Sequence, residues 1–163
     1  MKIDQACGKL NFVKPVPTLI HGYGYVVPDG RRTGSGGVGN AMPGLPGGDI
    51  GPWLKPAFDN KGYKNRGFES KSEKDLQSLR KNTAVMEALI DSFNKMIKER
   101  LTKLPVKHVE VKHVDLRRCI SNSLKGMPKL KPGTYLRDWG DELHPTSPAF
   151  EKIAKEFDEV LNS

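Results

Sequence analysis

The chain has 163 residues, of which 36% are apolar, 28% charged and 7% aromatic. This length suffices for the single domain that we expect over residues 1–163, because about 150 residues can bury about 70% of the surface that the unfolded chain exposes. No apolar run reaches the roughly 18–20 residues that cross a bilayer, so the sequence predicts no membrane span. The first five residues lack the basic-then-apolar layout of a signal peptide, but a truncated start would hide one, so the cellular compartment stays open.

The formal net charge is +8, from 27 Lys and Arg against 19 Asp and Glu. Clustered cations would favour nucleic acid, because they release the counterions of phosphates on binding. Here the cations of residues 55–131 are mixed with acids, and the tail from Asp138 onward is acidic, which is typical of a solvated surface. Nucleic acid is therefore not the expected partner. A basic, non-catalytic module for nucleic acid or other polyanions is the alternative function.

The first third of the chain predicts one strand and one long loop. Residues 1–15 show little periodicity and are expected to form an irregular arm. The apolar, β-branched run that follows predicts a buried strand near 18–26. Residues 28–56 are rich in Gly and Pro and predict a loop that is either a pocket rim or disordered. Its glycines 34–39 match a dinucleotide-binding pattern, but prolines follow them and no helix begins there, so no cofactor is predicted.

The rest of the chain alternates helices with a strand. Ser72 is a good N-cap for a helix that runs to Leu104, with an apolar stripe for the core at Leu76, Leu79, Met86, Ile90, Phe93, Ile97 and Leu101. A strand is predicted near 109–116. It contains His113, and because His108 lies five residues earlier the two rings would point to opposite faces, so no metal site is predicted. Residues 117–137 look irregular. A last helix is expected to begin at the N-cap Ser147, with Pro148 as its first helical residue and a buried face formed by Phe150, Ile153, Ala154, Phe157, Val160 and Leu161.

This order of strands and helices predicts an α/β fold with parallel strands. Only two strands are evident, whereas a buried parallel sheet normally has more. We therefore expect part of the sheet to be missing from the sequence.

The segment with the clearest chemistry lies just before the last helix. Asp141 precedes His144 by three residues, a spacing that can place a carboxylate against an imidazole. The carboxylate would fix the ring tautomer and stabilise the imidazolium that forms when His144 acts as a general base, while Glu142 would point elsewhere. From spacing alone, a surface acid–histidine pair is the default interpretation of the segment, because an Asp three residues before a His arises often by chance.

These residues also carry a family resemblance. The block Asp141-Glu142-Leu143-His144-Pro145-Thr146, followed by Phe150 and Ile153-Ala154, resembles the final conserved block of the SGNH (GDSL-type) hydrolases. Four further segments are similar to bacterial members: Leu19-Ile20-His21-Gly22-Tyr23, Pro28-Asp29-Gly30-Arg31, Gly51-Pro52-Trp53-Leu54 and Val114-Asp115-Leu116-Arg117. The resemblance spans about residues 17–161. It implies a partial flavodoxin-like, three-layer α/β/α fold whose N-terminal part is missing, with Asp141 and His144 as two members of a Ser-His-Asp triad.

The resemblance implies hydrolysis of acyl esters, of small molecules or of glycans, without a metal. The chain has no Gly-Asp-Ser nucleophile motif, and its serines, at positions 35, 70, 72, 78, 92, 121, 123 and 147, occupy no comparable strand-to-helix turn. The expected function is therefore that of the C-terminal portion of a serine esterase, inactive alone and completed by an N-terminal half or an oligomer partner. A truncated, inactive gene product is a further interpretation.

Overall fold

The computed structural model describes residues 2–32, 51–128 and 133–163. Its helices are α1 (Lys2–Lys9), α2 (Lys55–Asn60), α3 (Glu73–Met96) and α4 (Ser147–Leu161), and its strands are β1 (Val16–His21), β2 (Val109–Val114) and β3 (Lys125–Pro128). Short 3₁₀ turns cover Gly67–Glu69 and Thr134–Arg137, and a π-helical turn, Ile97–Leu101, extends α3. No described helix is both long enough and apolar enough to cross a membrane.

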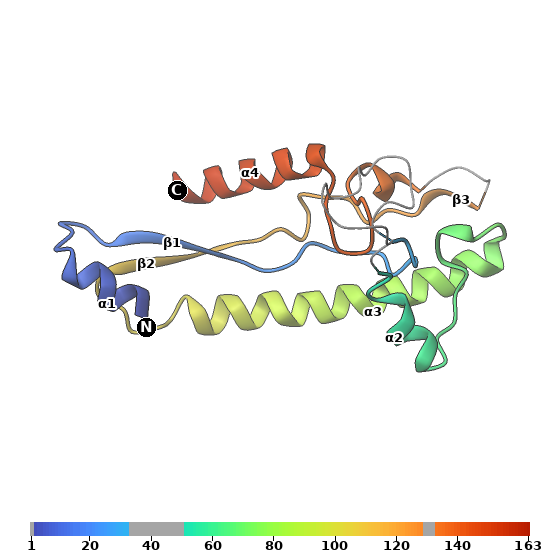
Figure 1. The fold of residues 1–163 in the computed structure, drawn as a ribbon, viewed down its shortest axis with the longest axis horizontal. Coiled ribbons are helices and arrows are strands. Elements are labelled where there is room, and N and C mark those ends of the chain that lie inside the picture. Colours follow the sequence, from blue (N-terminus) through green and yellow to red (C-terminus); the bar gives the residue numbers. More distant parts are fainter. Residues whose placement is uncertain (1, 33–50, 129–132) are drawn as a thin grey trace, which may run out of the picture.

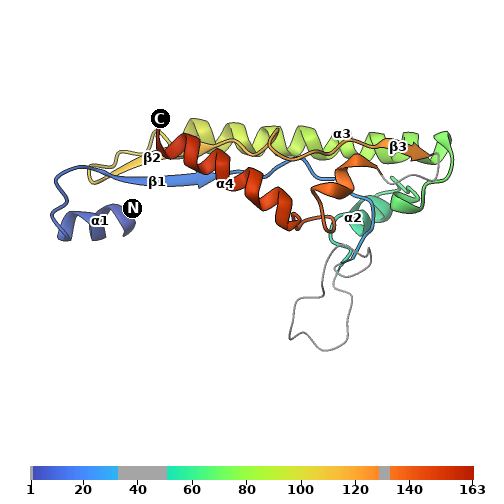
Figure 2. The same cartoon turned by 90° about the horizontal axis from the view of Figure 1, so that it is seen from above.

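The sheet consists of β1 and β2, which pair in parallel from Val16 opposite Val109 to His21 opposite Val114. In Figure 1, α4 lies above this pair, and Figure 2 shows the long α3 extending away from the strands, so that its π-helical end, Ile97–Leu101, is the part that contacts β2. The molecule is thus mixed α/β with a parallel strand pair, as the order of elements predicts. The glycine pattern at 34–39 and most of the Gly- and Pro-rich loop lie outside the described residues.

Several predicted boundaries are wrong. The first strand ends at His21 rather than near residue 26, and Gly22 is packed so closely that an added Cβ would lie 2.0 Å from Oδ1 of Asn94. The second strand ends at Val114 rather than at residue 116. The expected irregular arm contains α1. Its Asp4 carboxylate accepts the backbone N–H groups of residues 107 and 108, so α1 is tied to the chain entering β2.

The long helix begins where the sequence predicts. The hydroxyl of Ser72 accepts the backbone N–H of Asp75 at 3.2 Å, which satisfies one of the free donors of the first turn. The predicted apolar stripe is only partly buried: Leu76, Leu79, Ile90 and Ile97 are buried, whereas Phe93 is 47% exposed. Asn94, four residues after Ile90 and three before Ile97, lies on the same helix face, is buried and donates to the carbonyl of Tyr23.

The last helix begins one residue earlier than predicted. Thr146 rather than Ser147 is its N-cap, because the Thr146 hydroxyl accepts the N–H of Ala149 and donates to the carbonyl of Arg137 at 2.7 Å. Of the predicted buried face, Ile153, Phe157 and Val160 are half-buried, but Phe150, Ala154 and Leu161 are exposed.

The main core lies beyond the C-terminal ends of the strand pair. It consists of Val26, Val27, Leu79, Ile90, Ile120, Tyr135, Trp139 and Ala149. These residues come from the chain after β1, from α3, from the chain after β2, from the segment that leads into α4 and from the first turn of α4 itself. The core therefore supports the turn before α4, which holds Asp141 and His144.

Candidate functional site

The turn between Asp138 and Thr146 is closed by backbone hydrogen bonds. The N–H of Gly140 donates to the carbonyl of His144 at 2.8 Å, and the N–H of Thr146 donates to the carbonyl of Asp138 at 2.8 Å. The side chain of Asp138 is buried and accepts the N–H of Ser121 and the ammonium of Lys152. The turn is thus fixed at both ends by contacts that do not involve the side chains of Asp141 and His144.

Asp141 and His144 are brought together as their spacing predicts. Nδ1 of His144 lies 2.8 Å from Oδ2 of Asp141, and Oδ1 of Asp141 also accepts the backbone N–H groups of Leu143 and His144, at 2.7 and 2.8 Å. The Asp141 side chain is 2% exposed, whereas that of His144 is 55% exposed. A carboxylate in this position favours the tautomer with its proton on Nδ1, so Nε2 keeps a lone pair that can accept a proton.

A buried ion pair supports the turn from one side. Asp29 is fully buried, and its carboxylate accepts from the backbone N–H and from Nε of Arg31, the latter at 2.6 Å, and from the hydroxyl of Tyr135. The guanidinium of Arg31 donates in turn to the carbonyls of Trp139, Gly140 and Asp141. Three consecutive carbonyls of the turn are thereby held by one cation. Burial raises the pKa of Tyr135, so its hydroxyl stays a donor.

Glu142 supports the turn from another side, pointing away from His144 as the sequence predicts. Its carboxylate is fully buried and accepts four backbone N–H groups, from Gly30, Trp53, Leu54 and Lys55, at 2.6 to 3.0 Å. Burial raises the pKa of Glu142, and the four donated hydrogen bonds oppose that rise. Glu142 therefore joins the turn to the two ends of the Gly- and Pro-rich loop, close to residues 28–32 and 51–55.

Two aromatic side chains lie beside the pair. The ring of Trp53 meets that of His144 edge-on, with ring centroids 6.4 Å apart and an angle of 69°, and Trp53 is 44% exposed. Tyr23 stacks on Trp139 and donates its hydroxyl to the carbonyl of Leu143 at 2.6 Å. Burial, together with the charge of Asp141, raises the pKa of Tyr23. His144 thus stands on a surface with an aromatic border.

The sequence did not indicate Asp29, Arg31, Trp53 or Glu142 as site residues. Two signals were available: Asp29, Arg31 and Trp53 lie in the loop predicted as a possible pocket rim and in segments similar to the hydrolase family, and Glu142 lies in the final block itself. Among the described residues, no serine is hydrogen-bonded to His144. Ser35 lies outside them.

The remaining histidines do not join the site. His21 contacts Phe157 edge-on, and His108 lies at the entry of β2. His113 has a buried Nε2 without a hydrogen-bond partner, and burial lowers its pKa. Among residues 2–32, 51–128 and 133–163, no group of three or more His, Cys, Asp or Glu side chains could hold a metal ion.

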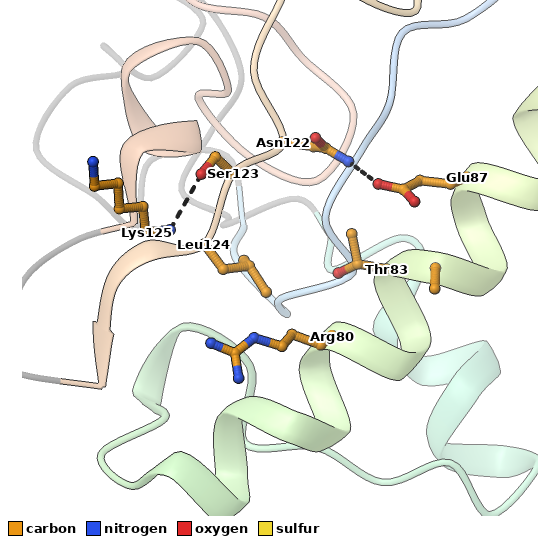
Figure 3. A pocket seen from close by; sticks show the side chains of 8 residues that line it. Arg80, Thr83, Glu87, Asn122, Ser123, Leu124 and Lys125 are labelled. Atoms are coloured by element: carbon orange, nitrogen blue, oxygen red, sulfur yellow. Dashed lines mark hydrogen bonds between the residues drawn. The ribbon is translucent and has the colours of Figure 1, made fainter.

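A separate hollow of about 450 Å³ lies between α3 and residues 122–125 (Figure 3). Its two cationic side chains are Arg80, which is paired with Glu73, and Lys125, whose ammonium group points away from the Arg80 guanidinium in Figure 3. Across the hollow, the amide of Asn122 donates to Glu87. The cations do not converge on a common anion position.

Comparison of the chain with protein-family models, with curated proteins and with solved structures finds no match. The arguments for function therefore depend on the geometry of the Asp141–His144 turn and on the resemblance of its sequence.

Proposed function

We propose that this chain contributes the histidine base and its aspartate partner to a serine-type hydrolase of acyl esters, similar to the SGNH hydrolases. The observation that supports this most directly is the 2.8 Å contact from Nδ1 of the exposed His144 to the buried Asp141. A surface acid–histidine pair would ordinarily leave the acid in water. Here the acid is desolvated, fixed by two backbone N–H groups and aimed at one ring nitrogen.

In the proposed reaction, Nε2 of His144 takes the proton of a hydroxyl group while the hydroxyl oxygen forms a bond to the ester carbonyl carbon. Asp141 stabilises the imidazolium that results. When the tetrahedral adduct collapses, the bond to the alcohol oxygen breaks and that oxygen takes the proton from Nε2. Water then repeats the same sequence on the acyl intermediate and releases the acid.

The hydroxyl nucleophile is the part that this chain does not supply, because its sequence holds no Gly-Asp-Ser motif. We propose that the nucleophile comes from another polypeptide segment that extends the strand pair, as an N-terminal half or an oligomer partner, in a flavodoxin-like, three-layer arrangement. The substrate would be an acyl ester of a small molecule or of a glycan. The exposed rings of Trp53 and Tyr23 offer it an apolar border.

The reactivity of the His144 ring can be tested on the chain alone with an activated ester, because an imidazole attacks p-nitrophenyl acetate directly and needs no serine. We expect a slow cleavage of this ester by the chain, and we expect His144→Gln to lower that rate to what the other three histidines contribute. Asp141→Asn should lower it as well, because the ring loses its orienting acceptor. His108→Gln, at an exposed histidine outside the site, is the matched control and should lower the rate far less than His144→Gln. Equal rates for the wild type and His144→Gln would reject the proposed base.

The absence of the nucleophile is tested by a fluorophosphonate probe, which reacts with activated serines. We expect the chain to stay unlabelled at probe concentrations that label a known serine esterase. Labelling that is lost in His144→Gln would show that the chain holds its own nucleophile, and the proposed division between two polypeptide segments would be wrong.

The alternative is a basic module for polyanions, and no contact among residues 2–32, 51–128 and 133–163 specifically favours it. On α3, Arg80 is paired with Glu73 and Lys95 with Glu99. Such pairs are typical of a solvated helix surface. The alternative predicts an affinity for heparin or nucleic acid that falls steeply with salt and does not depend on His144.

A further inference from the structure

Glu142 has a carboxylate with an unusual set of partners, all of them backbone N–H groups. Oε1 accepts from Gly30 at 2.8 Å and from Lys55 at 3.0 Å, and Oε2 accepts from Trp53 and Leu54 at 2.6 Å each. The four donors are 87 to 112 positions away in the sequence. Because both oxygens are saturated, the carboxylate holds two distant chain segments at a fixed distance from the turn.

One of the two segments that Glu142 holds is the start of α2, where no N-cap side chain accepts a backbone N–H group. Helix α2 has Leu54 at its N-cap position, which cannot provide a side-chain acceptor for the free N–H groups of the first turn. Glu142 supplies that acceptor from the neighbouring turn. In the other segment, the N–H of Gly30 donates to the same carboxylate. Gly30 has φ +82°, a left-handed conformation that glycine adopts without strain.

The consequence for the site concerns Trp53. Its backbone N–H is one of the two donors to Oε2, and its ring is the one that meets His144 edge-on at 6.4 Å. Glu142 and His144 lie two residues apart on the same turn. The turn therefore fixes the histidine on one side and, through Glu142, fixes the aromatic ring that borders it on the other.

We propose that Glu142 is a positioning residue that holds Trp53 against His144 and so sets the wall of the substrate site beside the base. The assignment of Trp53 as part of a substrate site rests on the proposed hydrolase function. The contact between Trp53 and His144 can nevertheless be measured without any hydrolysis.

Glu142→Gln tests the role of the carboxylate because it removes one acceptor oxygen and changes the shape of the side chain very little. A glutamine side chain has nearly the same shape but only one acceptor oxygen, and its NH₂ group would face two N–H donors. In either orientation, one pair of backbone N–H groups loses its acceptor. Loss of the acceptor at Oε2 frees the N–H groups of Trp53 and Leu54, and loss at Oε1 frees one donor of each segment, Gly30 and Lys55. In both cases the segment that carries Trp53 loses at least one of its three bonds to Glu142, while Asp141 and its contacts with His144 stay in place.

The test is proton NMR of the histidine ring C–H signals in the whole chain, with the His144 signals assigned by their loss in His144→Gln. Trp53→Leu removes the neighbouring ring and defines how far the His144 signals move when Trp53 is absent. We expect Glu142→Gln to move them toward the same positions, and the double variant to add little further. Glu151→Gln, at an exposed glutamate of α4, is the matched control and should move no histidine signal.

A purely structural role would lower the denaturant midpoint of Glu142→Gln but leave the His144 signals where the wild type has them, and that outcome would overturn the proposal. If Glu142→Gln does not fold, Glu142→Asp keeps the negative charge and both oxygens on a shorter stem. It should then move the His144 signals in the same direction by less, and no movement would equally reject the positioning role. The proposed function fails on a different readout, the ester cleavage by His144, so the two failures can be told apart.

Discussion

Replacing Asp29 by Asn should test how the site is anchored. Asp29 is fully buried and Arg31 is 5% exposed, and their contact at 2.6 Å is the centre of the network that holds the carbonyls of the turn. An asparagine keeps the size of the side chain but removes its charge and one acceptor oxygen. Oδ1 of Asp29 accepts the backbone N–H of Arg31, and Oδ2 accepts from Nε of Arg31 and from the hydroxyl of Tyr135. The donors that face the NH₂ group of the asparagine therefore lose their acceptor.

The expected loss follows from leaving a buried guanidinium without its counter-charge. Removing one partner of a buried ion pair costs about 3–5 kcal/mol of unfolding free energy, because the remaining charge stays desolvated. Tyr135→Phe removes only the hydroxyl that donates to the same carboxylate, and a hydrogen bond to a charged group is worth about 1.5–3 kcal/mol. Tyr23→Phe, which loses a bond to a neutral carbonyl, should cost about 0.5–1.5 kcal/mol.

The assay is urea denaturation at pH 7 followed by circular dichroism, with the shift in midpoint multiplied by a shared m-value. We expect the order Asp29→Asn, then Tyr135→Phe, then Tyr23→Phe from the largest loss to the smallest. A loss below about 1 kcal/mol for Asp29→Asn would show that the pair is not a desolvated anchor and would refute the reasoning. If Asp29→Asn is unfolded in water, the two tyrosine variants still decide the order.

Two further predictions concern the neighbourhood of the sheet and the start of α4. Arg117 lowers the pKa of Asp115 from 3.8 to about 2, so the stabilisation from this pair is present above about pH 4 and is lost as the pH falls toward 2. Both side chains are about a third exposed or more, so the difference in unfolding free energy between the wild type and Asp115→Asn should be only about 0.2–1 kcal/mol at pH 6. It should shrink as the pH falls through 2 and vanish at about pH 1, below the pKa of both states. Thr146→Ala should cost about 0.5–2 kcal/mol in urea denaturation, whereas Ser147→Ala should cost less, because Thr146 is the N-cap; the reverse order would contradict the observed cap.

The parts of the fold that the sequence predicts are those with local signals. Ser72 and the acids after it specify a helix start with groups that lie within one turn of each other, and the structure confirms that cap. The spacing of Asp141 and His144 similarly determines a contact across three residues. The predicted strands exist, but their ends depend on packing, such as that of Gly22 against Asn94, and no periodicity in the sequence records it.

Glu142 and Arg31, which hold the turn in place, could not be predicted because the contacts by which they do so are with residues far away in the sequence. Glu142 has as its partners backbone N–H groups that any residue except proline possesses, so the sequence of the donor segments carries no mark of the contact. Arg31 likewise binds three carbonyls. A long-range contact between a side chain and backbone leaves a signal at one of its two ends only, and that signal is a charged residue that the sequence alone would place on the surface.

The burial of these acids also changes what the net charge of the chain means. Asp29, Asp138, Asp141 and Glu142 are at most 3% exposed, so four of the 19 acids lie inside the molecule. Arg31 is buried with them, but most of the other cations are on the surface. The surface is therefore more positive than the net charge of the sequence indicates, and the tail from Asp138 onward is less acidic on its surface than its composition suggests. Such a surface attracts polyanions weakly whatever the protein does, and salt-dependent binding follows from either proposed function. Only a readout that depends on His144 separates the two, which is why ester cleavage, and not affinity for a polyanion, is the decisive measurement.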